Sequence, residues 1–117
     1  MSLSHNDLQI VIQVMAILNK EYKYNHSHTR LANRLHVSES KLRKIFKEAN
    51  NMTINDFLTR VRLKNAKELL ADTDDPIKKI ACDVGYDTRN LEKQFKTLTG
   101  LTPLEWKIKY RKARLAG

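Results

Sequence analysis

The sequence contains few of the residues that break helices or connect strands. Only three glycines and two prolines occur among its 117 residues, and no segment alternates polar and apolar residues as a strand does. Apolar residues instead recur at the three- and four-residue spacing of amphipathic helices. We therefore predict an all-α fold of seven helices.

Cysteine is nearly absent as well. The single cysteine, Cys82, excludes a disulfide bond within the chain and fits a reducing cytoplasm. It lies between Ala81 and Val84 in a segment that we predict to be a buried helix. We therefore interpret Cys82 as a small core residue rather than a nucleophile.

No hydrophobic run is long enough to cross a membrane. The longest apolar stretch, residues 10–18, is interrupted by Gln13 and is too short for a bilayer. A secretory signal, with a charged leader and a small-residue cleavage site, is not recognisable either. These absences predict a cytoplasmic protein with no membrane partner.

Residues arranged for catalysis or metal binding are also lacking. His26, His28 and His36 form the only histidine cluster, and no cysteine or carboxylate accompanies it at metal-ligand spacing. Neither a Ser/His/Asp arrangement nor a glycine-rich phosphate loop is present. The sequence therefore predicts no enzyme activity, no bound metal and no cofactor.

Positive charge is what the chain has in excess. Its 22 lysines and arginines outweigh 13 aspartates and glutamates, which gives a formal net charge of +9 and a pI of about 9.8. This balance favours a polyanionic partner such as DNA, RNA or an anionic membrane surface. From charge alone, a basic surface that is merely solvated is the alternative.

The chain also repeats itself once, without a gap, at an offset of 49 residues. The matching pairs include Ala32 with Ala81, Phe46-Lys47 with Phe95-Lys96, and Phe57 with Trp106. The matches fall mainly on apolar positions and helix starts. Such a repeat indicates one supersecondary unit that is used twice.

Helical spacing and capping residues locate the seven helices and divide the chain. The helices are predicted at residues 7–21, 28–35, 39–49, 54–71, 76–84, 88–98 and 103–115. The buried stripe of the first is predicted to be Leu8, Val11, Ile12, Met15 and Leu18. We expect a first helix-turn-helix subdomain at residues 1–52, a stiff linker helix at residues 53–72, and a second such subdomain at residues 73–117.

Each repeated unit has the residues that a helix-turn-helix requires. A small residue, Ala32 or Ala81, suits the close crossing of the two helices. Gly85 suits a turn residue with positive φ, whereas His36 at the corresponding place adopts that conformation less readily. We expect the apolar residue after each turn to close the core.

The helix after each turn has a buried face and a polar outer face. We expect Leu42, Ile45, Phe46 and Ala49 to face inward in the first unit and Leu91, Phe95 and Leu98 in the second. The outer residues, which we predict to contact DNA, are Ser40, Arg43, Lys44 and Lys47, followed by Arg89, Asn90, Lys93 and Lys96. Arginine bonds guanine and asparagine bonds adenine bidentately, and lysine binds guanine or phosphate. A solvated polar face is the alternative for either helix alone, but two such faces in register favour DNA.

Two further basic groups lie outside these helices. One is on the linker helix (Arg60, Arg62, Lys64, Lys67) and the other is on the last helix (Lys107, Lys109, Arg111, Lys112, Arg114). We interpret Arg62 and Lys67 as partners in helix-surface or structural ion pairs rather than as base contacts. The last-helix group is either a set of phosphate contacts or a solvated tail. Thr53 and Thr102 are predicted helix caps, and helix N-termini also suit phosphates.

Several stretches together resemble the DNA-binding domain of the AraC/XylS family of bacterial transcription regulators. They are residues 31–38, 42–47, 60–70, 80–86 and 95–103. The last two carry the pattern I-A-x-x-x-G-[FY] followed by F-K-x-x-x-G-x-[ST]-P, which is the most specific. The resemblance covers residues 8–112.

The resemblance implies sequence-specific binding of double-stranded DNA for transcription regulation. Both recognition helices would enter adjacent major-groove segments, roughly 34 Å apart. The family's base-contacting positions correspond to Ser40, Arg43 and Lys44 in the first helix, and to Arg89, Asn90 and Lys93 in the second. The resemblance also implies an activator that contacts RNA polymerase, with an upstream sensor or receiver domain; a free-standing short regulator is the alternative. We expect this chain alone to be monomeric.

The chain departs from the family pattern at two places. His36 stands where the family has glycine. One residue is missing after Tyr86, near the start of the second recognition helix. The alternative function is a basic helical module that binds RNA or an acidic protein, which would show little preference among DNA sequences.

Overall fold

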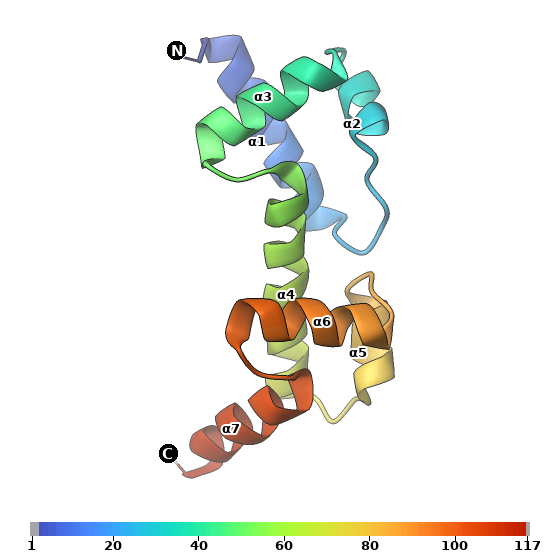
Figure 1. Cartoon of the computed structure of the whole chain (residues 1–117), viewed down its shortest axis with the longest axis vertical. Helices are drawn as coiled ribbons and strands as arrows, with labels where there is room; N and C mark the ends of the chain where they lie inside the picture. The colour runs from blue at the N-terminus through green and yellow to red at the C-terminus, as the bar shows by residue number, and fades with distance from the viewer. Residues whose placement is uncertain (1–2, 117) are drawn as a thin grey trace. The chain divides into compact units, whose positions relative to one another are not determined.

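The computed structural model describes the backbone of residues 3–116 and the side chains of residues 3–111. This part of the chain forms seven helices and no strand (Figure 1). The helices are α1 (His5–Lys20), α2 (His28–Arg34), α3 (Glu39–Asn50), α4 (Ile54–Asp72), α5 (Ile77–Asp83), α6 (Thr88–Thr99) and α7 (Pro103–Ala116). The predicted all-α class and the order of the helices are confirmed.

The helices belong to two compact units, Met1–Leu58 and Thr59–Gly117. The sequence suggested that the linker helix, residues 53–72, forms a segment of its own, but the division falls inside α4. The first turns of α4 bury Ile54 and Leu58 in the core of unit 1, whereas Ala66 and Leu70 are buried in unit 2. One continuous helix therefore supplies core residues to both units.

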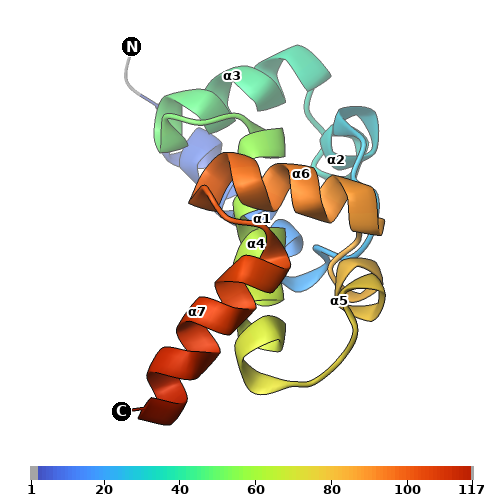
Figure 2. The same ribbon diagram turned by 60° about the horizontal axis from the view of Figure 1, so that its bottom comes forward.

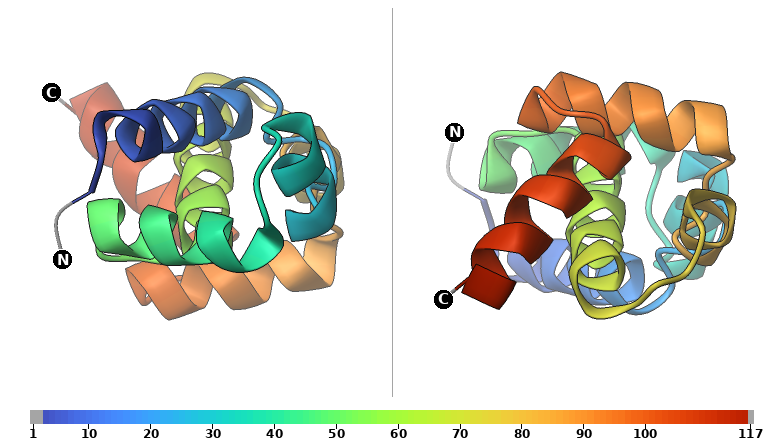
Figure 3. Two further views of the ribbon diagram at one scale, coloured as in Figure 1. Left: turned by 90° about the horizontal axis from the view of Figure 1, so that it is seen from above. Right: turned by 90° about the horizontal axis from the view of Figure 1, so that it is seen from below.

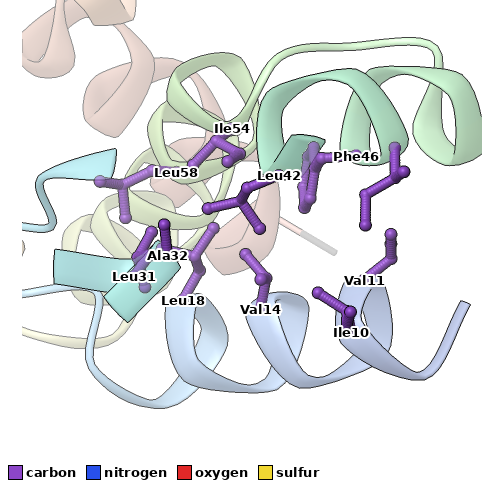
Figure 4. Close-up of a cluster of buried hydrophobic side chains, with 11 residues drawn as sticks. Ile10, Val11, Val14, Leu18, Leu31, Ala32, Leu42, Phe46, Ile54 and Leu58 are labelled. Atoms are coloured by element: carbon purple, nitrogen blue, oxygen red, sulfur yellow. The ribbon is translucent and has the colours of Figure 1, made fainter. Parts of the chain in front are cut away.

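In unit 1, α1 lies beside α3 (Figure 3, left). Its N-terminus carries a capping box, in which the Ser4 hydroxyl accepts from the Asp7 N–H at 3.0 Å and the Asp7 carboxylate accepts from the Ser4 N–H at 3.3 Å. The buried stripe of α1 is Ile10, Val11, Val14 and Leu18, which point toward Leu31, Leu42 and Phe46 and the start of α4 (Figure 4).

The predicted stripe of α1 was partly wrong. Val11 and Leu18 are buried as expected, but Leu8 and Ile12 are 42% and 57% exposed. The predicted stripe and the observed stripe both have helical spacing. The spacing alone therefore did not determine which side of α1 faces the core. Packing in the core of unit 1 selects the stripe that includes Val14, which is fully buried.

Unit 2 repeats the second half of unit 1 with the same helix boundaries. The bounds of α5 and α6 lie 49 residues after those of α2 and α3, and α7 begins 49 residues after α4. The rings of Phe46 and Phe57 meet edge to face, with centroids 5.6 Å apart and an interplanar angle of 83°. Their counterparts Phe95 and Trp106 pack the same way, at 5.9 Å and 80°. The repeat found in the sequence is therefore a repeat of structure.

In unit 2, α6 contacts both α5 and α7 (Figure 2). The N-terminus of α7 has a capping box, in which the Glu105 carboxylate accepts from the Thr102 N–H at 2.9 Å and the Thr102 hydroxyl accepts from the Glu105 N–H at 3.2 Å. The fully buried side chains of this unit include Ile80, Val84, Leu91 and Phe95.

Two core assignments in unit 2 were wrong. Cys82 is exposed, although Ala81 and Val84 on either side of it are fully buried. A helix of only two turns buries one narrow stripe, and Cys82 lies one position beyond it. Leu98, expected to face inward with Leu91 and Phe95, is 48% exposed.

Candidate nucleic-acid interface

The two helix-turn-helix turns are closed by the same hydrogen bonds. In the first, the N–H of Val37 donates to the Ala32 carbonyl at 3.0 Å and the N–H of His36 to Asn33 at 3.2 Å. In the second, Tyr86 donates to the Ala81 carbonyl at 2.8 Å and Gly85 donates to Cys82 at 3.1 Å. Both pairs form the Schellman motif, which requires a left-handed residue after the helix.

That left-handed residue is His36 in one turn, with φ of 58°, and Gly85 in the other, with φ of 92°. Histidine at this place therefore closes the first turn in the same way as glycine closes the second. The cost is a left-handed conformation at a residue with a Cβ atom. Helix α6 begins and ends 49 residues after α3. With one residue fewer after Tyr86 than the AraC/XylS pattern has, the second turn therefore has the same length as the first.

Helix α3 presents its predicted outer face to solvent. Ser38 caps the helix, because its hydroxyl accepts from the Lys41 N–H at 3.1 Å. Leu42, Ile45 and Phe46 are buried. The four predicted contact residues on the opposite side, Ser40, Arg43, Lys44 and Lys47, are all exposed. Ala49, predicted on the buried face, is exposed as well.

Two residues outside the predicted contact set, Glu39 and Thr29, hold Arg43 in place. Its guanidinium Nη1 donates to Glu39 Oε1 at 2.9 Å, one helical turn earlier. The hydroxyl of Thr29 on α2 donates to the other oxygen of Glu39 at 3.0 Å. The i, i+4 spacing of Glu39 and Arg43 was the available signal. The pair holds Arg43 on the exposed side of α3.

Lys41 lies at the edge of this outer face, on the side toward α1. Its ammonium is 3.3 Å from a carboxylate oxygen of Asp7 on α1. The pKa of Asp7 is lowered below its usual value, first by the backbone N–H of Ser4 and also by Lys41. Lys41 therefore joins α3 to α1 at the surface of unit 1.

Helix α6 also presents its predicted contact residues to solvent. Asp87 caps the helix, since its carboxylate accepts from the Asn90 N–H at 2.7 Å. Leu91 and Phe95 are buried. The four predicted contact residues, Arg89, Asn90, Lys93 and Lys96, are exposed. The side-chain amide of Asn90 also donates to Asp87 at 3.4 Å.

A shallow hollow on unit 2 joins α6 to the start of α7. It is lined by Arg89, Glu92, Lys93, Lys96, Thr97 and Thr102. The Lys96 ammonium acts on the pKa of Glu105, which is lowered first by the Thr102 N–H and hydroxyl and further by this lysine. Lysine, arginine and a capped helix N-terminus thus meet in one place, which suits an anionic ligand.

The other basic residues have mixed roles. Arg62 is only 8% exposed, and its Cζ lies 4.9 Å from the centroid of the Tyr86 ring, so it is a buried residue in contact with an aromatic ring rather than a base-contacting one. Lys67 forms no ion pair with the described residues; it lines a hollow with Arg60 and Lys64.

On the last helix, Arg111 pairs with Asp74 and lowers the pKa of that carboxyl. Lys112 and Arg114 lie outside the described side chains.

The described residues show neither a metal site nor a membrane span. Within them, no three histidine, cysteine, aspartate or glutamate side chains gather where they could hold a metal ion. None of their helices combines the length and apolar character needed to cross a membrane.

Comparison with known proteins finds relatives along most of the chain. A family model described as a helix-turn-helix domain matches residues 31–109. The Msm operon regulatory protein of Streptococcus mutans is 31% identical over 98 residues, which are 83% of this chain and 35% of that protein. The chain thus spans about a third of the length of that relative.

Solved structures share the fold. The C-terminal domain of AraT, a response regulator from Geobacillus stearothermophilus, is 27% identical, with a TM-score of 0.83 over 93% of this chain and 88% of that one. The DNA-binding domain of AdpA, in complex with a target DNA, is 21% identical, with a TM-score of 0.85 over 92% of this chain and 97% of that one. At this identity the second likeness concerns the fold alone.

Proposed function

The chain belongs to the AraC-type helix-turn-helix family, whose members bind specific DNA sequences to regulate transcription, and from this premise we propose how its side chains contact the duplex. Helices α3 and α6 enter two successive stretches of the major groove of one DNA molecule. One observation carries the proposal. The same helix-turn-helix occurs twice with the same boundaries, and each second helix presents an exposed basic face.

The exposed residues divide into two kinds of contact. We assign Ser40, Arg43 and Lys44 on α3, and Arg89, Asn90 and Lys93 on α6, to the base edges. Lys47 and Lys96, later in each helix, bind phosphates. The phosphate contacts supply much of the affinity, and the base contacts supply the choice of sequence. Arg43 gives up its bond to Glu39 when it binds a base, so part of its binding energy is offset.

The role of the full-length protein is also inferred from the family. We propose that this chain is the DNA-binding part of a longer cytoplasmic regulator with a sensor or receiver domain, and that it activates transcription through RNA polymerase. Three facts about the relatives support this. The Msm regulator is about three times as long as the matched segment, and AraT is a response regulator. A further relative, the HTH-type transcriptional activator RhaR of an Enterobacter species, is 32% identical over 77 residues. On its own the present chain is proposed to be monomeric and to need no cofactor.

The test is selection of bound duplexes from a random DNA library, followed by measurement of affinity against salt concentration. The proposal predicts enrichment of a bipartite site that covers about two helical turns. It also predicts that the logarithm of the binding constant falls linearly with the logarithm of salt concentration. Equal binding of all duplexes, or preference for RNA or an acidic protein, would contradict it.

A further inference from the structure

The structural repeat gives each residue of α3 a counterpart in α6. Both helices have twelve residues, and each is followed by a capping residue in the left-handed conformation, Asn51 after α3 and Gly100 after α6. The outer face of α3 follows the spacing i, i+3, i+4, i+7. The counterparts 49 residues later are Ser40 with Arg89, Arg43 with Glu92, Lys44 with Lys93, and Lys47 with Lys96. A carboxylate, Glu92, therefore occupies the place of Arg43.

The surroundings of Glu92 agree with this assignment. Its side chain is exposed and lines the same hollow as Arg89, Lys93 and Lys96. Arg43 is paired with Glu39 one turn earlier, but the counterpart of Glu39 is Thr88, which carries no charge. None of the ion pairs among the described side chains involves Glu92. Its carboxylate oxygens thus remain available to accept hydrogen bonds from a ligand.

We propose that Glu92 determines specificity by accepting a hydrogen bond from the exocyclic N4 amine of a cytosine in the major groove. This inference rests on the proposed function. An ionised carboxylate only accepts hydrogen bonds. In the major groove guanine presents acceptors at O6 and N7 and thymine presents O4, so both repel it. Adenine offers its N6 amine beside the N7 acceptor, whereas cytosine offers the amine without an adjacent acceptor.

The negative charge of Glu92 also increases the discrimination between DNA sequences. A carboxylate close to phosphates weakens binding to every duplex, and only a duplex with an amine at the right place offsets that loss. A site that rejects wrong sequences in this way discriminates by repulsion as well as by attraction. Arg43, at the equivalent place in unit 1, lacks this effect because its charge favours every duplex.

The experiment compares the sequences selected from a random library by the wild type, Glu92→Gln and Glu92→Arg. The wild type is expected to select cytosine at one position of the half-site bound by α6, with about 5- to 150-fold discrimination against other bases. Glu92→Gln should change that position to adenine, which glutamine bonds bidentately, and Glu92→Arg should change it to guanine. The other positions should keep their preferences.

The control is Glu68→Gln, which removes the same charge from an exposed position on α4 in the same unit and should leave all selected bases unchanged. Circular dichroism confirms that each variant folds, as expected for exposed positions. If Glu92→Gln selects the wild-type sequence and only binds every duplex more tightly, Glu92 is a source of general repulsion and the inference is wrong. If the wild type itself selects no sequence, the proposed function fails and the inference fails with it.

Discussion

The guanidinium carbon of Arg62 lies 4.9 Å from the centroid of the Tyr86 ring, which places a buried cation of α4 against the turn of the second helix-turn-helix. Arg62 is 8% exposed. The Tyr86 hydroxyl donates to the Thr59 hydroxyl, also on α4, at 3.4 Å. Tyr86 follows Gly85 and is the residue whose N–H closes the turn. The linker helix therefore supports the turn that positions α6.

Arg62→Ala should destabilise unit 2 by about 1–3 kcal/mol, because the variant loses a desolvated cation–π contact together with buried packing. Urea unfolding monitored by circular dichroism measures the change. Arg60→Ala, at an exposed position of the same helix, is the matched control and should alter stability by less than about 0.5 kcal/mol. Equal stability of the two variants would show that the Arg62–Tyr86 contact contributes nothing to the turn.

The left-handed conformation of His36 leads to a stabilising substitution. With a φ of 58°, His36 allows the first turn to close as Gly85 allows the second. This conformation costs a residue with a Cβ atom about 1–2 kcal/mol. Glycine avoids that cost but loses more backbone entropy on folding, about 0.5–1 kcal/mol. His36→Gly should therefore stabilise unit 1 by up to about 1 kcal/mol. His36→Val, which is β-branched, should destabilise it, and the same urea titration compares both variants with the wild type. A destabilised His36→Gly would mean that the histidine side chain makes a favourable contact that exceeds the backbone cost.

The features that depend on local chemistry were predictable from the sequence. Ser38 and Thr102 begin helices because a hydroxyl can accept from the free N–H groups of the first turn, and each does so. Asn51 and Gly100 end helices in the left-handed conformation. The gapless repeat predicted two similar units, and the helix boundaries confirm it.

The features that depend on packing were not predictable in the same way. The rotation of α1 is set by the core cluster in which Val14 is fully buried, and periodicity allowed a neighbouring stripe with Leu8 and Ile12. Cys82 was assigned to the core because its neighbours are apolar, but in a short helix one position decides burial. In the candidate interface, the bond from Thr29 to Glu39 was not predictable because it depends on α2 packing beside α3, whereas the Glu39–Arg43 pair had a signal in its i, i+4 spacing.

The capping box of α7 predicts how stability depends on pH. The pKa of Glu105 is lowered below its usual 4.5, chiefly by the Thr102 N–H. A carboxyl with a lowered pKa in the folded state stabilises the fold above its unfolded pKa, and this contribution is lost as the pH falls through the folded pKa. Glu105→Gln keeps a capping acceptor but cannot ionise. The wild type should exceed the variant in Tm near pH 7, and the difference should vanish in acid well below 4.5.

Thermal unfolding at a series of pH values from neutral to acid provides the measurement. Thr102→Ala is the companion variant, since it removes the hydroxyl that also lowers the pKa of Glu105. It should reduce the pH dependence without abolishing it, because the backbone N–H remains. A Tm difference between wild type and Glu105→Gln that stays constant with pH would show that the Glu105 charge does not contribute.

Arg43 and Lys47 separate the two kinds of DNA contact within one helix. Arg43→Ala should weaken binding to the selected site by about 1–3 kcal/mol, and the loss should be concentrated at one base pair. Lys47→Ala, one turn later on the same exposed face, should weaken binding to all duplexes alike and reduce the slope of the salt dependence by about 1. Binding of each variant to the selected site and to its single-base variants, at several salt concentrations, measures both effects. Because Arg43 already donates to Glu39 at 2.9 Å, Glu39→Gln should tighten binding at the same base pair by weakening the competing bond. A loss for Arg43→Ala that is equal on every duplex would instead assign Arg43 to the phosphate backbone and leave Ser40 and Lys44 as the base contacts of α3.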